Sequence, residues 1–285
     1  MEIAVFVKRV PMVGGKIVLT ADGQDVDTRM SGFTVSPHEE CAVEEAVRLV
    51  ERHGGSVTVI TLGPAAAADQ LRDMLALGAS RAILLETDGR EWGPIATAEA
   101  IVAAVRRPPG DRVAPGLGAP GAVAPGAVAP GVGAPDPVAP GTPLPYDLLL
   151  FGNEAADTGD FQVVVRVAHA LGLPCVTGIK NLEVSDAARA SRKYRGTEEV
   201  YRLPLPAVIS VKEGINLPRY PSLPGRLRAK RATIERFEPS WHAEGLRKER
   251  LRVPPGDSKR AEILGTGAAA VPALVALLDD LGLLP

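Results

Sequence analysis

Short apolar runs alternate with longer helical patterns along much of this chain, and this alternation constrains the fold more than any other feature of the sequence. The apolar runs are rich in β-branched residues and bounded by Gly, Pro or charge, as buried strands are. They lie at 2–8, 56–62, 82–86, 146–151 and 206–211, and helical patterns lie between the earlier ones at 37–54, 64–78 and 93–107. Such a run of βα units predicts an α/β fold, a doubly wound, mostly parallel, Rossmann-like sheet with helices on both faces.

Two segments depart from this rhythm. Residues 108–145 carry four copies of VAPG, a composition that favours neither helix nor strand, and we expect a disordered Pro/Gly/Ala-rich insertion. The tail is punctuated by proline over 216–237, where an extended chain is expected, and only 267–282 again has a helical pattern. We expect an α/β domain in two parts, 1–107 and 146–215. The insertion at 108–145 separates these parts, and a C-terminal arm follows at 216–285.

Composition excludes several classes of protein. The formal net charge of -2 gives no reason to expect nucleic acid as a partner, and no apolar run approaches the roughly 20 residues needed to cross a bilayer. The N-terminus enters strand-like alternation without a signal-peptide pattern, so we expect a cytoplasmic protein. Cys41 and Cys175 lie far apart, and no His/Cys cluster has metal-ligand spacing, so neither a disulfide framework nor a metal site is expected.

One polar turn stands out as a binding site. The stretch 152-GNEAADTGDFQ-162 follows an apolar run and precedes an amphipathic helical pattern. Gly152 allows a sharp turn off the strand, while Asp157, Thr158 and Asp160 can cap the helix. The unpaired N–H groups of a helix N-terminus favour an anion such as phosphate. A capped turn without a ligand remains the alternative, since the stretch is neither a Walker loop nor a GxGxxG fingerprint.

Read together with other stretches, this turn resembles part of a known family. The sequences 3-IAVFVKRVP-11, 35-VSPHEECAVEEAVRL-49 and 216-NLPRYPSLP-224 occur in the order and spacing of the β subunit of electron-transfer flavoproteins. Residues 16–28 and 61–85 fit the same pattern. The resemblance covers nearly the whole chain apart from 108–145 and the C-terminal end.

The resemblance implies a heterodimeric electron carrier rather than an enzyme with catalytic residues of its own. In this family the α subunit holds most of a redox-active FAD, and the β subunit covers one side of it. The β subunit also buries a nucleotide, which is AMP in the common branch and a second FAD in the electron-bifurcating branch. The implied partners are the α subunit, acyl-CoA dehydrogenases of fatty acid oxidation or other flavin dehydrogenases, and a quinone oxidoreductase that leads to the respiratory chain.

The resemblance also implies a set of nucleotide-binding residues, at strand ends and at one helix start. They are Phe6, Val7, Ser36, Pro37, His38, Glu39, Leu62, Gly63, Gly152, Asn153, Glu154, Ala155, Asp157, Thr158, Gly159, Asp160, Phe161, Gln162 and Val163. Asp157 and Gln162 are the side chains most expected to act in the turn. His38 would face the isoalloxazine ring of the shared FAD, near Val13–Lys16, although a solvated or capping histidine is the alternative.

This chain departs from the common branch in the same turn. The common branch has Asn-Gln-Thr-Gly where this chain has Phe161, Gln162, Val163 and Val164. A hydroxyl and a glycine are therefore missing at the phosphate end, and the identity of the nucleotide, AMP or a second FAD, stays open. Ser36 also replaces the usual Asn ahead of the helix.

The stretch 216–224, here called the recognition loop, matches the segment by which partner dehydrogenases grasp this family. Its prolines are expected to keep Leu223 out of any helix and leave its side chain exposed, with Tyr220, Arg226 and Lys230 as further contacts. An ordinary linker that wraps the α subunit is the alternative for this stretch.

Two alternatives remain for the whole chain. The first is a non-redox adenine-nucleotide-binding regulatory domain. The second is a nucleotide-hydrolysing or adenylating enzyme, but such an enzyme would need a phosphate-binding lysine or metal-binding carboxylates beside the turn, and these are lacking.

Overall fold

The computed structural model describes residues 1–12, 17–29, 31–107, 144–245, 248–253 and 262–284. The chain forms two units, one of Met1–Lys16 with Asp27–Lys248 and one of Ile17–Val26 with Glu249–Pro285. Except for residues 144 and 145, the insertion predicted at 108–145 lies outside the described residues, as does the stretch Val13–Lys16.

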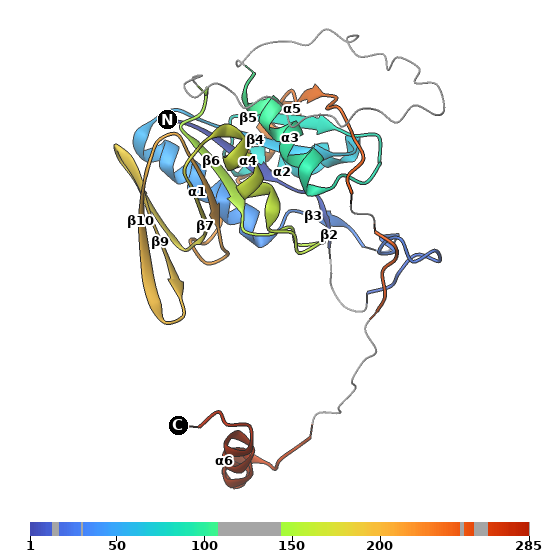
Figure 1. Ribbon diagram of the computed structural model, residues 1–285, viewed down its shortest axis with the longest axis vertical. Helices are drawn as coiled ribbons and strands as arrows, with labels where there is room; N and C mark the ends of the chain where they lie inside the picture. The colour runs from blue at the N-terminus through green and yellow to red at the C-terminus, as the bar shows by residue number, and fades with distance from the viewer. Residues whose placement is uncertain (13–16, 30, 108–143, 246–247, 254–261, 285) are drawn as a thin grey trace. The chain divides into compact units, whose positions relative to one another are not determined.

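A seven-stranded parallel sheet forms the centre of the larger unit within the described residues, in the order β12-β5-β4-β1-β6-β11-β7 (Figure 1). Its strands are β1 (Glu2–Val7), β4 (Ser56–Gly63), β5 (Arg81–Glu86), β6 (Leu148–Gly152), β7 (Cys175–Ile179), β11 (Ala207–Val211) and β12 (Glu235–Phe237). The inner strands are buried on both faces, which is why they read as continuous apolar runs in the sequence.

Helices cover both faces of this sheet. On one face, α1 (Pro37–His53) and α2 (Ala68–Leu77), the latter preceded by the 3₁₀ turn η1 (Ala65–Ala67), pack against the sheet in one apolar cluster. On the other face, α3 (Pro94–Val105) and α4 (Gln162–Leu171) pack side by side over a second cluster. The doubly wound α/β fold that the alternation predicts is therefore confirmed.

A smaller antiparallel sheet adjoins the edge strand β7. It has the order β10-β9-β8 and consists of β8 (Asn181–Val184), β9 (Ala187–Tyr194) and β10 (Thr197–Pro204). One face of β8 and β9 is buried while the other carries exposed residues, which is the pattern of a half-solvated sheet. The sequence analysis placed no strand in 181–204. A short ribbon of β2 (Val10–Pro11) and β3 (Phe33–Thr34) follows β1.

The segment 216–237, predicted to be extended, contains a helix instead. Helix α5 (Leu223–Arg231) begins after Ser222, whose hydroxyl accepts a hydrogen bond from the backbone N–H of Gly225. Prolines do not prevent this, because Pro224 stands in the first turn, where a missing N–H costs nothing. A Cβ on Gly225 would lie 2.7 Å from the carbonyl oxygen of Ala76, so this glycine allows α5 to pack closely on α2.

The smaller unit holds the C-terminal helical segment, with the 3₁₀ turn η2 (Gly267–Ala270) followed by α6 (Val271–Asp280). The helix predicted at 267–282 is therefore present. Its apolar side chains are exposed, among them Leu274, Val275 and Leu277. In the described parts of the chain, every helix is too short or too polar to span a bilayer.

Candidate functional site

The predicted nucleotide-binding residues converge at one edge of the central sheet. The strands β4 and β6 flank β1, and the carboxyl ends of all three lie at this edge, marked by Gly63, Gly152 and Val7. After β1 the chain continues to β4 and β5 on one side and then returns to β6 on the other. The position between β1 and β6 is thus a topological switch point, the place where open α/β sheets bind ligands.

The floor of this edge is apolar. The rings of Phe6 and Phe151 stack with centroids 4.2 Å apart and an interplanar angle of 15°. On the opposite face of the sheet, Thr61 pairs with Val7, and its hydroxyl is buried without a hydrogen-bond partner among the described residues. A buried hydroxyl without a partner is costly, so a polar ligand group that reached Thr61 would relieve that cost. This donor fits a nucleotide lying across the strand ends.

Helix α1 begins at this edge with a capping box. The Ser36 hydroxyl accepts from the Glu39 N–H (3.3 Å), and a Glu39 carboxylate oxygen accepts from the Ser36 N–H (3.1 Å). Glu39 is 7% exposed. Burial raises the pKa of its carboxyl to about 7, although hydrogen bonds from Ser36 and Lys8 act in the opposite direction.

Gly152 fits the turn against the start of α1. A Cβ at this position would lie 2.6 Å from Cγ of Glu39 and 3.3 Å from Cβ of His38. Any other residue would therefore push the turn away from the helix. The capping box at the start of α1 and the 152–162 turn therefore form one tightly packed unit.

His38 lies in this unit with its ring held by the backbone. Its Nδ1 accepts a hydrogen bond from the Glu213 N–H at 2.8 Å, so the proton of the neutral ring is on Nε2. Nε2 is 3.8 Å from Oε1 of Glu154. His38 and Glu154 are thus brought together at the strand ends, and Nε2 is the atom that can donate to a ligand.

The 152–162 turn closes on itself. The N–H of Ala155 donates to the carbonyl of Asp160 (3.0 Å), and the N–H of Gly159 donates to the carbonyl of Ala155 (2.7 Å). Gly159 has a φ of +65°, which glycine adopts without strain. Asp157 binds Nζ of Lys8 at 2.8 Å and accepts from the Thr158 N–H at 2.9 Å. The side chain of Asp157, which was predicted to act in the turn, therefore links the turn to the end of β1 through Lys8.

The N-terminus of α4 is already occupied by a carboxylate. Oδ1 of Asp160 accepts from the backbone N–H of Gln162 at 2.6 Å. The Gln162 side chain, which the resemblance singles out, binds Arg166 one turn along the helix, with its oxygen 2.8 Å from Nη2. Phe161 is 54% exposed. Asp160 thus binds one N–H at the start of α4, although the N-cap residue is Phe161 and no side chain caps the helix. The carboxylate still leaves this helix end less free for phosphate than the sequence suggests.

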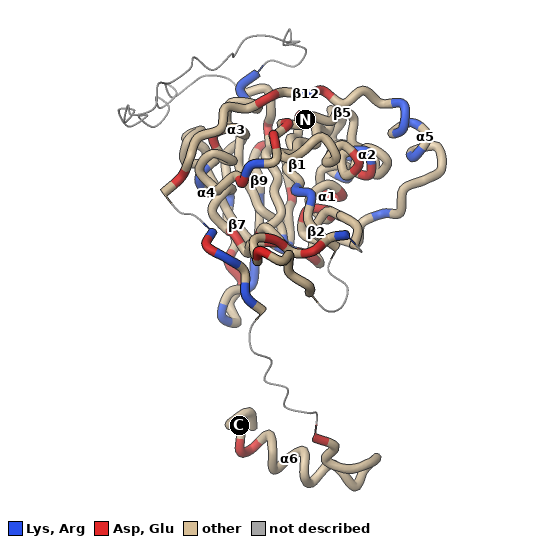
Figure 2. The backbone as a smooth tube through the Cα atoms, turned by 90° about the vertical axis from the view of Figure 1, so that its right-hand side faces the viewer, with Lys and Arg blue, Asp and Glu red and all other residues tan. Residues whose placement is uncertain are grey.

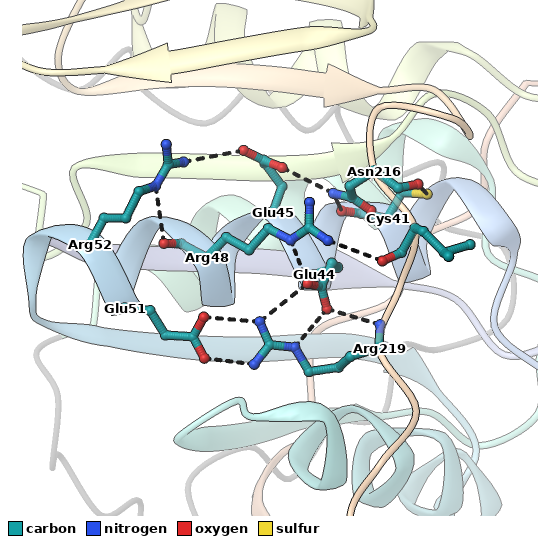
Figure 3. Close-up of polar contacts among 9 residues, drawn as sticks. Cys41, Glu44, Glu45, Arg48, Glu51, Arg52, Asn216 and Arg219 are labelled. Atoms are coloured by element: carbon teal, nitrogen blue, oxygen red, sulfur yellow. Dashed lines mark hydrogen bonds and ion pairs between the residues drawn. The ribbon is translucent and has the colours of Figure 1, made fainter.

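A polar network that the sequence motifs do not predict fixes the recognition loop on α1 (Figure 3). Arg219 contacts two acidic side chains of α1, with Nε 2.9 Å from Oε2 of Glu44 and Nη1 2.6 Å from Oε1 of Glu51. Asn216 donates to the Cys41 carbonyl and to Oε2 of Glu45, each at 3.0 Å. The acidic residues at 44, 45 and 51 recur at helical spacing, and this pattern could have indicated that one side of α1 binds a basic segment.

Glu44 is the buried member of this network, with 1% of the residue exposed. Burial acts to raise the pKa of its carboxyl, but hydrogen bonds from Arg219 and Arg48 outweigh it and hold the pKa below its usual value. The carboxylates of Glu51 and Glu44 in turn raise the pKa of Arg219. A buried charge paired in this way holds its partners in one geometry.

The predicted partner-binding residues lie away from the strand ends, on the recognition loop and α5. Tyr220 and Leu223 are 96% and 72% exposed. Arg226 and Lys230 are exposed on α5, where Lys and Arg residues gather (Figure 2). Leu223 is exposed as predicted, although it is the first residue of a helix rather than part of an extended loop.

Metal chemistry finds no support in the described residues, which contain no group of three or more His, Cys, Asp or Glu side chains placed to hold a metal ion.

Comparison with known proteins identifies the family. The model of the electron transfer flavoprotein domain matches residues 26–134 and 142–241. A protein of Bacillus subtilis named electron transfer flavoprotein subunit beta is 31% identical over 242 residues, 84% of this chain and 79% of the relative. Proteins of the same name from Bradyrhizobium diazoefficiens and Syntrophomonas wolfei are 29% and 31% identical, over 82% of this chain and 80% and 78% of their own lengths. The chain therefore belongs to the electron transfer flavoprotein family, as a member of the β-subunit group.

Proposed function

We propose that this chain is the β subunit of a heterodimeric electron carrier. It accepts electrons from flavin dehydrogenases through an FAD shared with an α subunit and passes them to a respiratory or other acceptor. The observation that carries this proposal is a physical link: α1 begins at the strand ends with His38 and holds the exposed recognition loop along its length through Glu44 and Arg219. One helix thus joins a cofactor edge to a docking surface.

At the cofactor edge, an FAD held mainly by the α subunit would supply the redox chemistry when bound. His38 would contribute one donor, Nε2, aimed by the hydrogen bond between its Nδ1 and the Glu213 N–H. A donor at that place favours negative charge on a reduced flavin. Oε1 of Glu154 lies 3.8 Å from this atom, so the carboxylate is a neighbour of the proposed donor.

Within the β subunit, the crevice between β1 and β6 would hold a nucleotide, AMP or a second FAD. The stacked rings of Phe6 and Phe151 offer an apolar surface on one face of the sheet, and Thr61 offers an unpartnered hydroxyl on the other. The role proposed for an AMP here is structural, and the described residues hold no metal-ligand set beside the turn.

Two surfaces would bind proteins. The recognition loop and the start of α5 present Tyr220 and Leu223 to a dehydrogenase, with Arg226 and Lys230 attracting an acidic partner. The smaller unit presents the exposed apolar residues of α6. We assign that face to the α subunit, because an exposed apolar helix of this kind normally packs on a partner.

The test is to co-express the chain with its α partner, denature the pure complex and identify the released nucleotides. One FAD with one AMP per heterodimer supports a simple carrier. Two FAD per heterodimer support the electron-bifurcating branch, in which the β subunit has a flavin of its own. A complex that releases adenine nucleotide but no flavin would contradict the electron-carrier proposal and favour a regulatory nucleotide-binding domain.

A further inference from the structure

A small cavity lies next to the nucleotide crevice, at the carboxyl ends of β6, β11 and β7. Its volume is about 220 Å³. The residues that line it include three cations and no acid, and they are Asn153, Phe161, Thr177, Gly178, Arg192, Lys193, Tyr194 and Lys212. Only Asn153 and Phe161 belong to the site that the family resemblance implies.

An irregularity in β7 builds the wall of this cavity. The register between β7 and β11 shifts after Ile209, and Gly178 adopts a φ of +68°. Its N–H donates to Oγ of the fully buried Ser210 at 3.0 Å rather than to a strand carbonyl. A Cβ on Gly178 would lie 2.9 Å from Oδ1 of Asn153 and 3.3 Å from Cε of Lys212. Glycine is therefore required for Asn153 and Lys212 to approach at this point.

The side-chain amide of Asn153 is oriented so that its NH₂ group can donate a hydrogen bond to a ligand. It is 8% exposed, and its Oδ1 accepts from Oγ of Ser210 at 3.4 Å. With the carbonyl oxygen of the side chain engaged, the amide NH₂ is the group left for a ligand. Ser210 thereby fixes a donor in the wall that the turn and the cavity share.

The cations give the cavity its charge. Arg192 is held by Oε2 of Glu199 at 2.7 Å and by the Thr177 carbonyl at 2.9 Å, which neutralises part of its charge. Lys193 and Lys212 are exposed, and within the described residues neither forms an ion pair within 4.0 Å, although Glu198 is the cross-strand neighbour of Lys193. Two lysines that are free of ion pairs in this part of the chain, beside a fixed amide donor, are the chemistry that binds phosphate.

The position at which the family motif would hold phosphate is less suitable in this chain. The carboxylate of Asp160 already accepts the Gln162 N–H at the start of α4, and a second anion there would meet its charge. The cavity lies on the other flank of β6, one strand spacing of about 5 Å from the crevice. Asn153, which follows β6 in the turn, also lines the cavity, so the turn and the cavity adjoin.

We propose that this cavity, rather than the N-terminus of α4, holds the phosphate or diphosphate group of the nucleotide bound by the β subunit. The inference rests on the proposed function, since it places one part of the nucleotide proposed above. Whole small-molecule ligands occupy about 300–1,000 Å³, so the cavity fits the phosphate part alone. The base and ribose remain in the crevice between β1 and β6.

The experiment compares AMP with adenosine, which lacks the phosphate. Nucleotide is stripped from the purified heterodimer, and both compounds are titrated by calorimetry into the wild type and the double variant Lys193→Gln/Lys212→Gln. The expected result is a loss of AMP affinity of about tenfold or more, because two charged contacts are removed, with unchanged adenosine affinity. Lys180→Gln is the matched control, since Lys180 is exposed near this edge but does not line the cavity.

A second variant tests the alternative position. Asp160→Asn removes the negative charge at the start of α4 and keeps a side-chain oxygen for the Gln162 N–H. If the phosphate were bound at the start of α4, this change would raise AMP affinity. If the phosphate is bound in the cavity, AMP affinity should stay nearly the same. Unchanged AMP affinity in the double lysine variant, or a clear rise in Asp160→Asn, would overturn the inference and leave the proposed function standing. A wild-type complex that binds and releases no nucleotide other than the FAD of the α subunit would overturn the inference together with the proposed β-subunit nucleotide.

Discussion

Arg219 binds the buried carboxylate of Glu44, and the two residues are 175 positions apart in the sequence. The Arg219 backbone N–H donates to the same carboxylate oxygen at 3.1 Å, so Glu44 fixes both the side chain and the main chain of the loop. Arg48 completes the pairing, with Nε 2.6 Å from Oε1 of Glu44. The recognition loop is therefore held in one conformation before any partner arrives, which reduces the entropy lost on docking.

The change Glu44→Gln should destabilise the protein and loosen the recognition loop. It leaves the guanidinium groups of Arg219 and Arg48 without their buried counter-charge, which costs about 2–4 kcal/mol. Glu51→Gln is the matched control, because Glu51 binds the same arginine but its side chain is 54% exposed, and its loss should cost less than about 1 kcal/mol. Thermal unfolding and hydrogen exchange over 217–222 measure both effects. Equal, small losses in the two variants would show that Glu44 does not act as a buried anchor.

The change Leu223→Ala should weaken electron acceptance from the cognate dehydrogenase. Leu223 is 72% exposed at the first turn of α5, and truncating such an interface anchor costs about 1–3 kcal/mol of docking energy. Steady-state reduction by the dehydrogenase measures this loss, and reduction by dithionite should be unchanged. Leu227→Ala, one turn further along α5 and 50% exposed, is the control for a general effect on the helix. Loss of FAD or of assembly in the Leu223 variant would show instead that this residue belongs to the core or to a subunit interface.

The sequence predicts the inner strands of the central sheet, because buried parallel strands leave continuous apolar runs, but it does not predict the edge strands β7 and β12. The strand predicted at 82–86, for example, is observed at Arg81–Glu86. Helix α5 could not be predicted in the same way, because only two of its residues, Gly225 and Ala229, are buried and it lacks an apolar face. Its position depends on packing against α2, a contact between segments far apart in sequence.

The candidate site shows the same division. The family motifs name His38, Glu39 and Gly152, and these residues do lie together, because the start of α1 packs on the end of β6. The burial of Glu44 and the position of Lys212 beside a cavity could not be predicted. Glu44 has the sequence surroundings of a solvated helix residue, and only the return of the chain over α1 buries it.

The change Asp157→Ala should lower the stability of the protein slightly and leave the flavin spectrum of the complex near normal. The ion pair between Asp157 and Lys8 is partly exposed, with 27% and 41% of the side chains accessible, so its loss should cost about 0.5–1 kcal/mol. The variants Asp157→Ala, Lys8→Gln and the double variant form a cycle, in which the double loss should be smaller than the sum of the single losses. Unchanged stability combined with much slower electron transfer would contradict the structural role and favour a redox-active second flavin.

The change Glu39→Gln should stabilise the protein at alkaline pH and have little effect near pH 4.5. Burial raises the pKa of Glu39 from 4.5 to about 7, so the folded chain holds this proton more tightly than the unfolded chain. The stability contributed by the protonated group is complete below pH 4.5 and is lost as the pH rises through 7, by about 3 kcal/mol in all. Glutamine resembles the protonated carboxyl at every pH, and its side-chain oxygen can still accept from the Ser36 N–H in the capping box. Denaturation measures the free energy of unfolding of both proteins at pH 5 and pH 8. The difference between Glu39→Gln and the wild type should become more favourable to the variant as the pH rises. In the control Glu183→Gln, where the side chain is 63% exposed, the difference from the wild type should be small and the same at both pH values. A variant that is less stable than the wild type at pH 8 would mean that the folded protein stabilises the charged carboxylate of Glu39.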